Sequence, residues 1–118
     1  MSNVELLLKA IKDQAELFLK LNGEFAPFAS FIQANAKITN VGAYSESTSS
    51  AEMYNILLDD AYEKLEDEDI RLYGIALNGV DNGQDVLVIE FLLSADKIYE
   101  QIYPYSILDG EVKFGDMR

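Results

Sequence analysis

The sequence predicts an α+β fold, an antiparallel sheet of about five strands with two helices packed on one face, in the order α-β-β-α-β-β-β. Two segments carry apolar residues at helical spacing behind serine-initiated capping boxes, and the remaining segments show the alternation and turn residues of strands. The chain has 118 residues. This length fits one folding unit, so we expect a single domain over residues 1–118.

The first helix is predicted over residues 3–21. Ser2 and Glu5 have the spacing of a capping box, in which a serine hydroxyl accepts from the backbone amide three residues later. Gly23 supplies the left-handed residue that ends a helix. Apolar residues recur on one face of this segment: Val4, Leu7, Leu8, Ile11, Ala15 and Phe18.

Residues 25–46 are predicted to form a hairpin of two strands that turns at 34–36, with Pro27 near the start of the first strand or on a sheet edge. Ser49 and Glu52 repeat the capping-box pattern and open a second helix that runs to about Leu65. The four carboxylates of residues 66–69 oppose the C-terminal helix dipole, so we expect the helix to end there.

The rest of the chain has the pattern of strands. The first is expected over Ile70–Asn78, followed by a hairpin loop at Val80–Gln84 that contains Asn-Gly. Asp85–Ser94 is apolar on both faces and is therefore predicted to be the central strand. Lys97–Tyr105 alternates, and a short final strand is expected at Val112–Phe114.

Composition excludes several classes of function. The chain has 21 Asp and Glu against 9 Lys and Arg, a net charge of −12, and no His or Cys. Disulfide scaffolds, thiolate zinc sites and thiol nucleophiles are excluded, and imidazole is absent as a general base. An acidic surface repels phosphates and anionic lipid heads, so neither nucleic acid nor a membrane is an expected partner. No signal peptide is evident, and we expect a cytoplasmic protein without a cofactor.

The acidic segment is the first candidate site. Thirteen carboxylates lie between Glu46 and Asp96, opposed only by Lys64 and Arg71. Such a segment is either a docking surface for a basic protein or a solvated face that keeps the protein soluble. Because no catalytic alternative remains, we favour docking. The predicted partner-binding residues are Asp59, Asp60, Tyr62, Glu63, Glu66, Asp67, Glu68 and Asp69.

Tyrosines on one strand form a second candidate. Tyr99, Tyr103 and Tyr105, with Tyr73 beside them, are expected to share a sheet face. Tyrosine suits a protein interface, since it offers apolar area and a hydroxyl. The alternative, which we favour, is that these rings cover the core beneath the helices.

Two weaker patterns do not support chemistry. The segment Asp81–Asp85 resembles the start of a calcium loop, but the bidentate Glu and flanking helices are missing, and a hairpin turn accounts for it. Adjacent carboxylates such as Asp59 and Asp60 lie on a predicted solvent face, which does not favour acid–base catalysis. We therefore expect no metal site, no catalytic residue and no enzymatic activity.

Two short segments carry a resemblance. Residues 23–29 read GEFAPFA, and residues 103–105 read YPY. The first resembles a stretch found after the first helix in small uncharacterised bacterial domains, which also have a Pro-Tyr near their end. The overall type, a small acidic chain without cysteine, is similar to immunity proteins of bacterial contact-dependent growth inhibition and polymorphic toxin systems. The resemblance implies a cytoplasmic protein that binds and blocks a cognate toxin.

The leading hypothesis is thus an immunity-type inhibitor that neutralises a basic toxin domain, expected to be a nuclease, because such an enzyme is positive where it grips phosphates. One alternative is a phage-type inhibitor that mimics DNA charge, of the anti-restriction or anti-CRISPR kind. Another is a non-enzymatic regulatory or structural module that forms a homodimer through a sheet edge or the tyrosine face.

Overall fold

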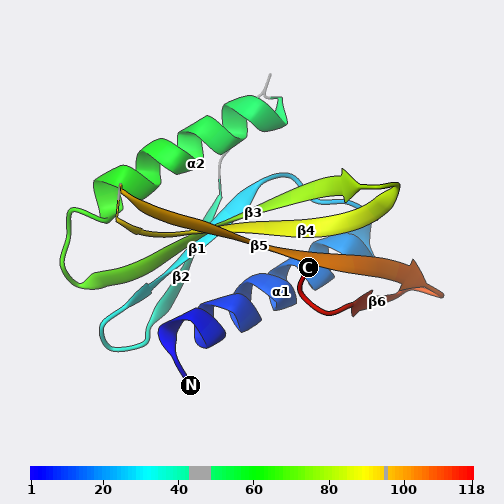
Figure 1. Ribbon diagram of the computed structural model, residues 1–118, viewed down its shortest axis with the longest axis horizontal. Helices are drawn as coiled ribbons and strands as arrows, with labels where there is room; N and C mark the ends of the chain where they lie inside the picture. Colours follow the sequence, from blue (N-terminus) through cyan, green and yellow to red (C-terminus); the bar gives the residue numbers. More distant parts are fainter. Residues whose placement is uncertain (43–48, 95) are drawn as a thin grey trace.

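The computed structural model describes residues 1–42, 49–94 and 96–118, and over these residues it contains two helices and six strands (Figure 1). Their order is α-β-β-α-β-β-β-β, so the predicted α+β class and element order are confirmed, and β6 matches the short final strand expected at Val112–Phe114. The elements are α1 (Asn3–Asn22), β1 (Phe28–Gln33), β2 (Ile38–Gly42), α2 (Ser50–Lys64), β3 (Ile70–Asp81), β4 (Gln84–Ser94), β5 (Lys97–Leu108) and β6 (Glu111–Phe114).

All pairings between neighbouring strands are antiparallel, in the order β2-β1-β3-β4-β5-β6. β3 and β4 lie in the middle, so the interpretation of Asp85–Ser94 as a central strand is confirmed. The turn between them is tighter than the predicted loop: only Asn82 and Gly83 separate the strands, both with positive φ (52° and 78°). Asn-Gly accommodates these angles, which match the twist of the flanking strands.

Capping side chains begin both helices as predicted. The Ser2 hydroxyl accepts from the Glu5 amide at 3.1 Å, and the Ser49 hydroxyl accepts from the Glu52 amide at 3.2 Å. α1 ends at Gly23, whose φ of 75° lies in the left-handed region where a side chain is disfavoured. α2 ends directly before the acidic residues 66–69.

The predicted placement of both helices on one face of the sheet is wrong. Leu7 and Ile11 of α1 share a buried cluster with Phe28 and with other strand residues whose side chains point to the same face of the sheet. Leu57 of α2 shares a second cluster with Phe31, whose side chain points to the opposite face. Figure 1 shows the sheet between α2 above and α1 below. Helical periodicity predicts that each helix buries one stripe, but it does not specify which side of the sheet receives it.

β1 explains why the sheet needs a helix on each side. Residues 28–32 are all buried, so this interior strand is covered on both faces. Pro27 directly precedes β1, which confirms its expected position near the strand start and not the alternative of an edge strand. On β3, Gly74 brings α1 close: a Cβ at this position would lie 2.7 Å from Cδ1 of Ile11.

The C-terminal residues fold back along β5. The Gly115 amide donates to the Pro104 carbonyl at 2.7 Å, and the Arg118 amide donates to the Ile102 carbonyl at 2.9 Å. The Arg118 guanidinium forms an ion pair with Asp81 at the end of β3. Neither α1 nor α2, the helices within the described part of the chain, is long and apolar enough to cross a membrane.

Candidate functional site

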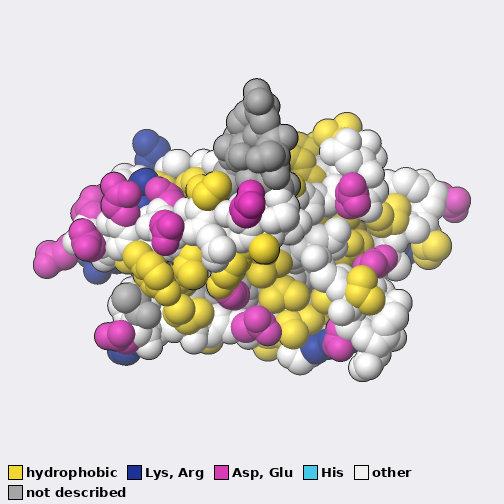
Figure 2. Space-filling view, turned by 90° about the horizontal axis from the view of Figure 1, so that it is seen from above, with side chains coloured by type: hydrophobic (Ala, Val, Ile, Leu, Met, Phe, Trp, Pro, Cys, Tyr) yellow, Lys and Arg dark blue, Asp and Glu magenta, His cyan; other side chains and the backbone are white. Residues whose placement is uncertain are grey.

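The predicted partner-binding residues lie on the second half of α2 and in the turn that follows it. Asp59, Tyr62 and Glu63 are exposed on α2, and residues 66–69, here called the acidic turn, are exposed throughout. Figure 2 views the α2 side of the molecule and shows acidic side chains gathered over this end of α2. The structure therefore brings most of the predicted residues together on one surface.

Asp60 is the exception, because its carboxylate accepts a hydrogen bond from a buried residue. The hydroxyl of Tyr73, which is fully buried, donates to one carboxylate oxygen of Asp60 at 2.8 Å. The Lys64 ammonium donates to the other oxygen at 2.8 Å. Burial and the hydrogen bond to Asp60 raise the pKa of Tyr73, so the ring stays neutral and its hydroxyl remains a donor. Asp60 thus joins α2 to β3.

The acidic turn is anchored to the end of β1. The Gln33 side-chain amide donates to the Asp69 carboxylate at 2.9 Å, and the Ala34 backbone amide donates to the Asp69 carbonyl at 2.8 Å. Within the turn, the Asp69 amide donates to the Asp67 carboxylate at 2.9 Å. Among the described residues, Glu66 and Glu68 form no side-chain hydrogen bond or ion pair. Two carboxylates therefore hold the turn in place and two project freely into solvent.

The tyrosine strand belongs mainly to the core. Tyr103 and Tyr105 are 6% and 4% exposed and lie in the cluster beneath α1, with the half-buried Tyr99 packed against it. The Lys12 ammonium lies 3.8 Å from the centre of the Tyr103 ring. Tyr73 lies on the opposite face, so the expected four-ring surface does not form. The favoured core interpretation is confirmed, and burial raises the pKa of each of the three β5 tyrosines.

A surface that the sequence analysis did not single out lies beside α2. The buried cluster under α2 includes residues of β1, β3 and Leu92. On this side of the sheet, β4 and β5 carry six side chains that are exposed or half-buried, which we call the β4–β5 face. Its members are Val88, Glu90, Ile98, Glu100, Ile102 and Pro104. Figure 2 shows apolar side chains beside α2 with acidic ones among them.

Two glutamates oppose each other in the centre of the β4–β5 face. Glu90 of β4 is directly paired with Glu100 of β5 in the strand register. The Tyr54 hydroxyl of α2 donates to Glu90, with its oxygen 2.5 and 3.0 Å from the two carboxylate oxygens. Burial and this hydrogen bond raise the pKa of Tyr54. The alternation of Ile98, Glu100 and Ile102 was visible in the sequence, but the opposition of Glu90 to Glu100 depends on register.

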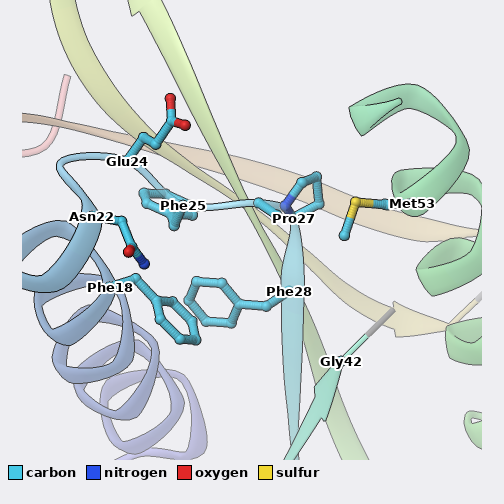
Figure 3. Close-up of a pocket in the computed structure, with 9 residues that line it drawn as sticks. Phe18, Asn22, Glu24, Phe25, Pro27, Phe28, Gly42 and Met53 are labelled. Carbon is cyan, nitrogen blue, oxygen red and sulfur yellow. The ribbon is translucent and has the colours of Figure 1, made fainter. Parts of the chain in front are cut away.

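A pocket of about 590 Å³ lies between the end of α1 and the start of α2 (Figure 3). Phe18, Phe25 and Phe28 form edge-to-face pairs on one side of it, and Met53 lies across from them. Its described lining includes one ionisable side chain, Glu24. The GEFAPFA segment thus contributes two largely buried rings to the core, and the described lining of the pocket contains no pair of groups that could exchange a proton.

Over residues 1–42, 49–94 and 96–118, no three Asp or Glu side chains are close enough together to hold a metal ion. The side chains gathered at the acidic turn and on the β4–β5 face are carboxylates and aliphatic groups. No protein-family model, curated protein or solved structure matches this chain.

Proposed function

We propose that this protein is an immunity-type inhibitor that binds a basic toxin domain in the cytoplasm and blocks it without performing chemistry itself. The observation that carries the proposal is the exposed carboxylate surface of α2 and the acidic turn, in a chain of net charge −12. Its anchoring by Asp67 and Asp69 supports a surface whose charges are held in fixed positions before binding.

Electrostatics supports a basic partner. Complementary fields raise association rates from about 10⁵–10⁶ M⁻¹s⁻¹ to about 10⁸–10⁹ M⁻¹s⁻¹ at low salt. A nuclease is the expected toxin class, because its substrate groove must attract phosphates. Carboxylates that occupy such a groove would satisfy the same cationic side chains and exclude the nucleic acid.

The test reverses the charge of acidic side chains that form no hydrogen bond or ion pair within the described part of the protein. Glu66→Lys with Glu68→Lys changes two exposed side chains of the acidic turn and leaves Asp67 and Asp69 in place. The matched control, Glu111→Lys with Asp116→Lys, makes the same change of charge on exposed residues near the C-terminus. Binding to the toxin domain, which the proposal expects to be encoded beside this gene, is followed by stopped-flow fluorescence at 25 and 300 mM NaCl.

The acidic-turn variant is expected to lower the association rate about tenfold or more at low salt and to flatten its salt dependence, whereas the control changes it less. Equal effects of the two variants would show that only net charge matters, and would remove the acidic turn from the interface.

A further inference from the structure

The β4–β5 face lacks a covering element in the described part of the chain. α2 packs over β1 and β3, so Val88 and Glu90 of β4 and the facing residues of β5 remain partly exposed on its side of the sheet. Ile98 is 45% exposed, and Val88, Ile102 and Pro104 are half-buried. A half-open apolar surface on a rigid sheet is typical of a protein interface.

The two carboxylates on this face indicate that a binding partner should carry a positive charge. Glu90 and Glu100 lie directly opposite each other, and like charges in that position destabilise a strand pair. The ion pairs among the described residues involve neither of them. Within the described residues, these two carboxylates thus lie side by side among aliphatic groups and form an ion pair with no Lys or Arg. A cation from outside would relieve their repulsion.

The geometry also prepares the site for such a cation. The Tyr54 hydroxyl fixes the Glu90 carboxylate, which is half-buried, while Glu100 has no side-chain hydrogen-bond partner in the described residues. A planar guanidinium can donate hydrogen bonds to both carboxylates at once, and apolar residues next to that arginine can cover Ile98 and Ile102.

We propose that the β4–β5 face receives an apolar surface of a basic protein, with an arginine seated between Glu90 and Glu100. The inference rests on the proposed function. In the complex with the toxin, the β4–β5 face would be the desolvated centre of the interface, and the acidic turn would be its exposed rim. The two parts differ kinetically: rim charges govern association, and a buried charge pair governs dissociation.

The first experiment needs no natural partner. Acetyl-Leu-Arg-Leu-amide is titrated into the ¹⁵N-labelled protein at 25 mM NaCl, with the citrulline peptide as an uncharged control of the same shape. Amide shifts are expected at residues 86–90 and 98–102, with a Kd at least fivefold lower for arginine than for citrulline. Glu100→Gln is expected to abolish this preference, and Glu111→Gln to preserve it.

Three results overturn the inference. One is equal binding of both peptides, and another is arginine-dependent shifts confined to residues 66–69. The third is concentration-dependent self-association that perturbs the same amides, since the occupant would then be a second copy of this chain. These results leave the proposed function standing, because the inhibitor is tested separately by its association rate.

The second experiment uses the toxin domain. Glu100→Gln is expected to raise the dissociation rate about tenfold or more while changing the association rate less than the acidic-turn variant does. An unchanged dissociation rate would place the β4–β5 face outside the complex, even if the acidic turn proved essential.

Discussion

Replacement of Glu100 by glutamine should make the isolated protein more stable. In most positions the loss of a surface charge has little effect on the free energy of unfolding. Here the carboxylate lies opposite Glu90 in the register of β4 and β5, and no cation of the described chain pairs with either group. Glutamine keeps the size and polarity of the side chain and removes the repulsion.

The magnitude follows from the cross-strand geometry. Directly opposite residues have Cβ atoms about 5 Å apart, so the carboxylates lie within roughly 6 Å of each other. Two unit charges at about 6 Å repel by about 0.7 kcal/mol at the dielectric constant of water, and by more where burial excludes solvent. Because Glu100 is exposed and its side chain can turn away, we expect a gain of about 0.5–1 kcal/mol at low salt.

Urea unfolding followed by circular dichroism measures this gain. The experiment compares the natural chain, Glu100→Gln and Glu111→Gln at 20 mM and 1 M NaCl. Glu111 is an exposed strand glutamate that faces Leu108, so its variant reports the effect of net charge alone. The gain from Glu100→Gln should exceed that of the control at 20 mM and shrink at 1 M, where the Debye length is about 3 Å. A gain no larger than the control, or a loss of stability, would refute the reasoning.

Two further predictions concern the core. Tyr73→Phe should lower the free energy of unfolding by about 1–2 kcal/mol at pH 7, because it removes a hydrogen bond to the charged Asp60. The pKa of Tyr73 is raised in the folded state, so the stabilisation by its hydroxyl is complete below the unfolded pKa of about 10 and declines above it. In urea unfolding, the difference in free energy of unfolding between the natural chain and Tyr73→Phe should therefore narrow above about pH 10. A difference that stays constant with pH would contradict this. Gly74→Ala should cost about 1–3 kcal/mol, because its Cβ would lie 2.7 Å from Ile11 Cδ1 in a filled core. Gly79→Ala on the same strand should lower the free energy of unfolding by less than about 1 kcal/mol, because its Cβ would lie 3.5 Å from the nearest atom. Equal losses of stability for the two variants in thermal unfolding would mean that Ile11 moves aside.

Much of the architecture could be predicted from local patterns. The capping serines, Gly23 and the Asn82-Gly83 turn each act through the backbone within a few residues, so their effect does not depend on distant contacts. Hydrophobic periodicity located both helices and the central strand for the same reason.

The candidate site was predictable only in part. Charge density indicated the exposed carboxylates of α2 and the acidic turn, because a run of acidic residues cannot be buried without partners. It did not separate Asp60, which bonds to Tyr73, from Glu66 and Glu68, which have no such partner among the described residues. That distinction depends on which strand passes beneath α2.

Local chemistry along this chain specifies its helices, its turns and its strongly negative charge. The side of the sheet that each helix covers, the opposition of Glu90 to Glu100 and the open β4–β5 face arise only when the strands align. Strand register joins residues that are far apart in the chain, and many alternative registers satisfy the same alternation, so packing of the whole molecule selects among them.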